Sequence, residues 1–162
     1  MDVKTFIPSN MNLIICGYKV EGWNKVVVTR NSPTFRQIRG IRGKNTRVRL
    51  EDSSAVISIT VPQSEDVNDV LSLIALADIQ YGTCRLEVML KDITSDTIFT
   101  TTNGYLTMLP PISYSSEVED NTWEIYCDES MFVQGGSKSA SAGIVEGSVS
   151  RLKDFVSDIT GI

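Results

Sequence analysis

The chain has 162 residues, a length typical of one compact domain, and 41% of them are hydrophobic while 22% are charged. This composition excludes a disordered or collagen-like chain, and no apolar run approaches the roughly 18 residues that a membrane span requires. The net charge is −5, and the chain has no histidine, the commonest general base and the commonest metal ligand. We therefore expect a protein that is not an enzyme and that binds no metal or cofactor.

The first half of the chain predicts a series of short strands. The first ten residues, MDVKTFIPSN, contain no apolar signal-peptide core, so we expect synthesis and folding in a cytoplasm. Apolar and polar residues then alternate with the period of two that is typical of half-buried strands. The predicted strands cover residues 13–16, 25–30, 34–38, 47–50 and 55–61.

One segment among these strands is strongly basic. Residues 30–49 contain seven of the 15 lysines and arginines and none of the 20 carboxylates. Such a segment suits nucleic acid or an acidic surface on another copy of the chain, and it could also be no more than an exposed hairpin. Single-stranded nucleic acid would need interleaved aromatic residues for stacking, and only Phe35 is near. We favour docking onto an acidic neighbour, and the residues expected to make contacts between subunits or rings are Arg36, Arg39, Arg42, Lys44, Arg47 and Arg49.

A helix is predicted at about residues 64–78. Ser64 is a suitable N-cap, and carboxylates follow it in the first turn, where the helix dipole favours negative charge. The residues expected to pack against the β core recur at helical spacing and are Val67, Val70, Leu71 and Ile74. A single amphipathic helix in a β protein is expected to cover one open side of a barrel or sandwich.

Strands resume after the helix. They are predicted at residues 84–91, 97–102, 105–108 and 122–127, and Asn103-Gly104 predicts a type I′ turn that joins the second and third of them. Three cysteines, Cys16, Cys84 and Cys127, are far apart and form no CxxC motif. We expect them to be reduced, buried thiols.

The composition changes after residue 130. We therefore divide the chain into a β domain (1–130), a Gly/Ser-rich linker (131–148) and a short amphipathic helix (149–162). A helix this short is marginal alone, so it should form only when docked on its own barrel or on a neighbouring molecule. The residues expected to dock are Leu152, Phe155, Val156 and Ile159.

No motif for chemistry reaches the required pattern. Gly40 and Gly43 do not have the spacing of a phosphate-binding loop, and no helix pattern follows them. The carboxylates that begin the predicted helix, Asp66 and Asp69, lack the glycine and glutamate of a calcium loop. Three further carboxylates, Glu117, Glu119 and Asp120, are interpreted as solvated loop residues.

The order of these elements resembles the tail tube proteins of contractile-tailed bacteriophages. The matching segments are the strand at 13–17, the run from GYKVEGW to VVVTR, the basic segment with its glycines, the stretch VISITVPQSEDVNDVLSLIALAD and the Trp123 strand NTWEIYCDE. The resemblance covers about residues 13–128, and its motifs are structural rather than catalytic. Residues beyond 130 have no counterpart in it.

The resemblance implies a mainly β barrel or two-sheet sandwich with one flanking helix. It also implies that six subunits form a ring and that rings stack into the inner tail tube, inside a contractile sheath. The implied partners are other copies of the chain, the sheath outside, the tape-measure protein and passing DNA in the lumen, and baseplate and terminator proteins at the ends. No sequence-specific nucleic-acid binding is expected. The implied location is the tail of the virion.

Three other functions remain open. The Gly/Ser-rich segment and the terminal helix also suit a baseplate adaptor, a tail-terminator ring or a secreted ring of a type VI-like system. A small barrel could instead bind single-stranded nucleic acid, with an affinity that falls steeply as salt rises. An enzyme of an unfamiliar kind is the last alternative.

Overall fold

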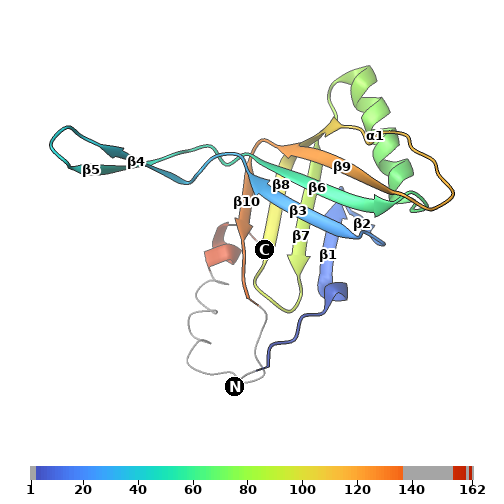
Figure 1. Ribbon diagram of the computed structural model, residues 1–162, viewed down its shortest axis with the longest axis horizontal. Coiled ribbons are helices and arrows are strands. Elements are labelled where there is room, and N and C mark those ends of the chain that lie inside the picture. The colour runs from blue at the N-terminus through green and yellow to red at the C-terminus, as the bar shows by residue number, and fades with distance from the viewer. Residues whose placement is uncertain (1–2, 137–154, 160, 162) are drawn as a thin grey trace.

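The computed structural model describes residues 3–136, 155–159 and 161. Short antiparallel strands and one long helix make up most of these residues (Figure 1). In chain order, the elements are a 3-10 turn η1 (Pro8–Asn10), β1 (Met11–Ile15), β2 (Tyr18–Val20), β3 (Lys25–Arg30), β4 (Phe35–Arg39), β5 (Asn45–Arg49), β6 (Ala55–Pro62), α1 (Val67–Tyr81), β7 (Leu86–Asp92), β8 (Ile98–Met108), β9 (Asp120–Cys127) and β10 (Ser130–Val133). No helix in the described ranges is both long and apolar enough to span a membrane.

Eight strands form one sheet that bends into two layers. Its order is β2-β1-β7-β8-β9-β6-β3, and β10 also pairs with β8. The long strand β8 joins the layers, because its first part pairs with β7 while its second part, from Gly104 on, pairs with β9. Figure 1 shows β3, β6 and β9 running across β1, β7 and β8. The predicted fold class, a mainly β barrel or sandwich with one flanking helix and a short C-terminal helix, is confirmed.

The core lies between the two layers, and it follows from the alternation in the sequence. Every second residue of β6 from Ala55 to Val61 is fully buried, and its partners on β9 include the buried Trp123 and Ile125. The facing layer contributes alternate residues of β7, among them Val88, which is also fully buried. Removing such side chains from water is the main source of stability, at about 1.5–3 kcal/mol for each large one.

Helix α1 begins and ends three residues later than predicted. Its N-cap is Asp66, not Ser64, and the Asp66 side chain makes no capping hydrogen bond. The preceding turn is instead held by Asn68, whose Nδ2 donates to the carbonyl oxygens of Pro62 and Glu65 at 2.9 and 3.0 Å. Gly82 closes the helix in the left-handed conformation, with φ of 67° and its N–H bonded to the Asp78 carbonyl. A turn that is held by a side chain from inside the helix cannot be predicted from the N-cap residue alone.

Residues expected to pack from the helix lie on its inner side. Val67 and Leu71 are buried, and Ile74 packs against the core while still partly exposed. Val70 is half-buried.

The predicted turn at Asn103-Gly104 is wrong. Strand β8 runs through these residues without a break from Ile98 to Met108. Gly104 pairs with Leu86 on one side and Cys127 on the other, and a Cβ at this position would lie 3.1 Å from Ile125 Cγ2. The glycine therefore permits close packing where the sheet bends, which is the other common reason for a glycine inside a strand.

Two smaller expectations also change. The sheet extends beyond residue 130, because β10 continues β9 along the same edge of β8: Cys127 pairs with Gly104, and Ser130 pairs with Thr101. Only Cys127 is a buried thiol; Cys84 is half-buried, and Cys16 is exposed in the β1–β2 turn with φ of 51°. The predicted strand at 13–16 thus ends one residue early, at Ile15.

Candidate subunit-contact surfaces

The basic segment forms a hairpin that stands apart from the rest of the molecule. Strands β4 and β5 pair only with each other, and this hairpin (residues 35–49, the arm) projects away from the two-layered body (Figure 1). All six predicted contact residues are exposed on it: Arg36, Arg39, Arg42, Lys44, Arg47 and Arg49. Within the described part of the chain, no carboxylate forms a salt bridge with any of them. Arg30, the first cation of the segment, lies outside the arm and stacks on Phe132 at 4.9 Å.

The pairing of the arm gives it two different faces. Residues that pair directly in antiparallel strands point to the same side. Phe35, Arg39, Arg47 and Arg49 therefore share one face, where the Arg47 guanidinium lies 4.3 Å from the centre of the Phe35 ring. The opposite face carries Arg36 beside more apolar residues of both strands. The arm thus offers charge on one side and a mixed surface on the other.

The tip of the arm exposes an isoleucine between cations. The turn is closed by the Gly40 N–H, which donates to the Lys44 carbonyl at 2.9 Å, and Gly43 adopts a φ of 80°. No other part of the described chain covers Ile41, and its side chain is fully accessible to solvent. The end of the hairpin therefore presents an exposed isoleucine that another surface could bury.

Hydrogen bonds hold the base of the arm (the arm root, residues 31–32 and 52–54). Ser32 Oγ donates to Asp52 Oδ2 at 2.6 Å, and the Ser54 N–H donates to Asp52 Oδ1 at 2.9 Å. These bonds, that from Ser32 first, lower the pKa of Asp52 to about 2, with a smaller contribution from the charge of Arg30. Asn31 Nδ2 donates to Ser54 Oγ at 3.1 Å. The root therefore fixes the direction in which the arm leaves the body.

Two exposed apolar surfaces are not indicated by the predicted elements. On the outer side of α1, Leu73, Leu76 and Ile79 are all exposed. In the connection between β8 and β9 (residues 109–119, the β8–β9 loop), the exposed side chains include Ile112 and Tyr114. The apolar residues of α1 outside its predicted packing positions were the available signal for the first surface. The Pro110-Pro111 step only indicated an extended exit from the strand.

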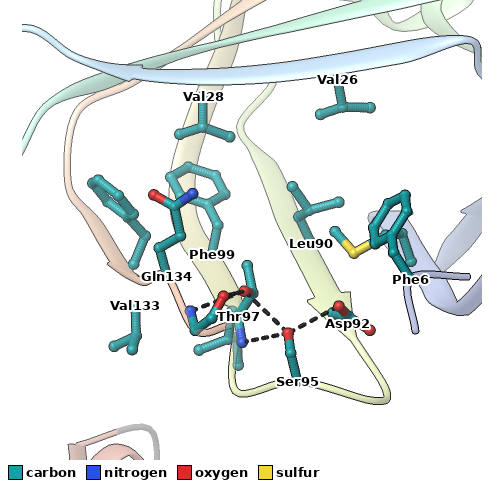
Figure 2. Close-up of a pocket in the computed structure, with 14 residues that line it drawn as sticks. Phe6, Val26, Val28, Leu90, Asp92, Ser95, Thr97, Phe99, Val133 and Gln134 are labelled. Atoms are coloured by element: carbon teal, nitrogen blue, oxygen red, sulfur yellow. Dashed lines mark hydrogen bonds between the residues drawn. The ribbon is translucent and has the colours of Figure 1, made fainter. Parts of the chain in front are cut away.

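A pocket of about 330 Å³ opens at one edge of the two layers. Figure 2 shows Val26 and Val28 of β3 facing Leu90 and Phe99 across it. Its carboxylate, Asp92, is buried, and burial opposes ionisation. Hydrogen bonds from the Thr94 and Ser95 groups outweigh that effect and lower its pKa. Asp92 thus stabilises the β7–β8 turn.

The site residues predicted at the C-terminus are only partly described. Leu152 lies outside the described residues. Residues 155–159 are helical; Phe155 is mostly exposed, Val156 is half-buried, and Ile159 lines a shallow hollow together with Met89 and Met131 on the outer face of the sheet. In the ranges that the structure describes, no group of three or more acidic or cysteine side chains is arranged to hold a metal ion.

Comparisons with known proteins give one sequence relative and several structural ones, while no family model matches the chain. Structural protein ORF10 of Pseudomonas phage KPP10 is 22% identical over 148 residues, which is 85% of this chain and 86% of that protein. The tube-terminating cap of the anti-feeding prophage superposes with a TM-score of 0.59 at 11% identity, covering 84% of this chain and 95% of the cap chain.

Two structures of an extracellular contractile injection system, PVC, are also similar. A chain of its sheath–tube complex gives a TM-score of 0.56 at 14% identity over 82% of this chain and 93% of that one. A chain of its sheath/tube terminator gives 0.55 at 13% identity over 80% and 97%. The chain is thus similar over most of its length to a phage structural protein, and it shares its fold with chains of a tube-terminating cap, a sheath–tube complex and a sheath/tube terminator.

Proposed function

We propose that the chain is a structural subunit on the axis of a contractile phage tail and that it forms a ring at one end of the tail tube. The observation that carries this proposal is the arm: six exposed cations without an acidic partner in the described chain, on a fold shared with chains of a tube-terminating cap and of a sheath–tube complex. Such a surface is expected to find its partner on another subunit. The phage relative, a structural protein, supports a location in the virion tail.

The end of the tube is favoured over its repeating body by the structural relatives. Two of the three solved structures described above are a tube-terminating cap and a sheath/tube terminator. The third comes from a sheath–tube complex, so the repeating inner-tube subunit, made of stacked hexameric rings, remains the second candidate. On either candidate the chain is not an enzyme, and the resemblance to tail tube proteins implies six subunits per ring.

The proposed partners follow from this position. Further copies complete the ring, the last ring of the tube lies on one side, and the sheath or its terminator lies outside. Tape-measure protein and DNA would pass through the lumen without sequence-specific contacts. A baseplate adaptor or a secreted ring of a type VI-like system would place the same ring in a different assembly.

Electron microscopy of the purified protein, together with its mass in solution, tests the proposal. Discrete rings whose mass does not grow with concentration are expected of an end ring. Long hollow tubes would instead assign the chain to the repeating tube. A protein that stays monomeric at high concentration, both alone and with purified tube subunits, would contradict both candidates.

A further inference from the structure

We propose that the arm of one copy docks on the β8–β9 loop of a second copy, so that the subunits join head to tail. This inference rests on the proposed ring-forming function and names the two surfaces that make the ring contact.

The two surfaces lie at opposite ends of the same strand. The arm leaves the body where β6 begins, at Ala55, which pairs with Arg30. The β8–β9 loop returns to the body where β6 ends, because Pro62 pairs with Asp120. In Figure 1 the arm points away from α1 and from this end of the sheet. A contact between two different surfaces of identical subunits is heterologous, and repeating it with a closing rotation produces a ring.

The loop presents an apolar surface that nothing in the described chain covers. Ile112, Tyr114 and Val118 are 91%, 86% and 70% exposed. Exposed apolar side chains that lie this close together on one segment are typical of an interaction site.

The loop is nevertheless held in place. Gln63 donates from Nε2 to the Ser113 carbonyl, and its Oε1 accepts from the Glu119 N–H at 3.2 Å. The Gln63 N–H also donates to the Glu119 carbonyl at 3.0 Å. A loop fixed at two points loses less conformational freedom when a partner binds, which favours binding.

Charge identifies the arm of another copy as the occupant. Residues 62–69 and 109–122 cover the loop, the turn before α1 and the first residues of α1 and β9, and they carry six carboxylates and no lysine or arginine. These carboxylates are Glu65, Asp66, Asp69, Glu117, Glu119 and Asp120. The arm is the opposite case, since residues 31–50 contain six cations and no carboxylate. It also exposes Ile41 at its tip and part of Phe35, so each surface combines apolar side chains with one sign of charge. The carboxylates of the loop would repel a nucleic acid. The arm, in contrast, complements the loop both in charge and in exposed apolar side chains.

Cross-linking between defined positions tests the contact. In a Cys16→Ser/Cys84→Ser background, one protein carries Ile41→Cys and a second carries Tyr114→Cys. A short bismaleimide should give covalent dimers from their mixture at least about tenfold faster than from Ile41→Cys mixed with Ile93→Cys, an exposed position in the β7–β8 turn. A chain with both Ile41→Cys and Tyr114→Cys should give a ladder that stops at the size of the ring. Equal rates for the two mixtures under conditions where rings form would overturn the docking and leave the ring-forming function intact.

Charge reversal provides a second, independent test. Arg39→Glu/Arg42→Glu/Lys44→Glu and Glu117→Lys/Glu119→Lys should each abolish ring formation, and the chain that combines both sets should recover it. Recovery is expected because the interaction between the two sites, not either site alone, decides assembly. If neither set affects rings, or if the combined chain remains monomeric with an unchanged melting temperature, the proposed contact is wrong. If the wild-type protein forms no rings under any condition, the proposed function fails first, and the microscopy above identifies that outcome.

Discussion

Asp52 illustrates how a single side chain fixes the direction of the arm. Its carboxylate accepts hydrogen bonds from Ser32 and Ser54. Ser32 lies in the connection that enters the arm, and Ser54 lies in the connection that leaves it. We expect Asp52→Ala to loosen the arm root and to raise the rate at which trypsin cleaves within residues 30–49 by several-fold. The neighbouring exposed carboxylate gives a matched control, Glu51→Ala, which should leave cleavage near the wild-type rate.

The same residue predicts a pH dependence. Because these hydrogen bonds lower the pKa of Asp52 from 3.8 to about 2, the folded protein binds its proton less readily than the unfolded chain does. The stabilisation of the arm root by these hydrogen bonds is therefore complete above about pH 4 and is lost as the pH falls toward 2. Equal acid sensitivity of arm cleavage in the wild type and in Asp52→Ala, measured with an acid protease, would contradict this role.

Cys127 and Cys16 are expected to differ sharply in reactivity. Cys127 is fully buried, and this burial raises the pKa of its thiol to about 11, whereas Cys16 is exposed in a turn. A thiol reagent should label Cys16 within minutes and Cys127 only after unfolding. In the folded protein the pKa of Cys127 lies above the usual 9.0. The contribution of its buried neutral thiol to stability is therefore complete below about pH 9 and is lost as the pH rises toward 11. Between pH 8 and 10.5 the free energy of unfolding should fall by about 2 kcal/mol more in the wild type than in Cys127→Ala, as measured by urea denaturation.

Gly104 is the position at which a side chain would disturb the bend of the sheet. A Cβ there would lie 3.2 Å from the Leu86 carbonyl oxygen as well as 3.1 Å from Ile125 Cγ2, and the backbone oxygen cannot move away without breaking the β7–β8 pairing. Gly104→Ala should therefore destabilise the protein by roughly 1–3 kcal/mol. Gly40→Ala, in the exposed arm, is a suitable control because its nearest neighbour would be the Lys44 carbonyl at 3.7 Å. Similar melting temperatures for the two variants would show that the sheet tolerates the added methyl group.

At the scale of the elements, the sequence predicts those that are defined by their own periodicity. Strand β3 is predicted at the residues where it is found, and β6 differs by one residue, because burial on one face imposes a period of two whatever the neighbouring strand. The turn predicted at Asn103-Gly104 is wrong because the local turn preference of these residues is outweighed by their pairing with β7 and β9, two strands that are distant in sequence. The start of α1 is misplaced for a similar reason, since the Asn68 side chain holds the preceding turn through hydrogen bonds to the carbonyl oxygens of Pro62 and Glu65.

The candidate surfaces show the same division. The arm can be recognised from charge alone, because a run of cations without carboxylates is visible in the sequence before the fold is known. The β8–β9 loop cannot, because its apolar residues and its carboxylates gain a shared surface only when Gln63 ties the loop to the end of β6. Local sequence thus identifies one partner of the proposed contact and not the other.

The arm can be altered without unfolding the body, because β4 and β5 pair only with each other. We expect Arg39→Glu/Arg42→Glu/Lys44→Glu to leave the melting temperature within about 2 °C of the wild type, as is typical of surface substitutions. The same triple variant should stay monomeric in analytical ultracentrifugation. A control with the same change in net charge is Lys4→Glu/Lys19→Glu/Lys91→Glu, whose cations are exposed elsewhere, and it should still assemble. Assembly by the arm variant, or its loss in the control alone, would count against contacts made by the arm.

At the scale of the whole molecule, the charges are separated along one direction, with the basic arm at one end of β6 and the carboxylates of the loop and of the turn before α1 at the other. Because both surfaces are exposed, their attraction should be screened by salt, with a Debye length of about 10 Å at 0.1 M and about 3 Å at 1 M. Ring formation should therefore weaken by about tenfold or more between these concentrations, as followed by sedimentation. Ile41→Ser should weaken assembly at both, since the burial of an isoleucine side chain is not screened. Rings that grow more stable as salt rises would mean that apolar contacts dominate, and the arm would then act through Ile41 rather than through its arginines.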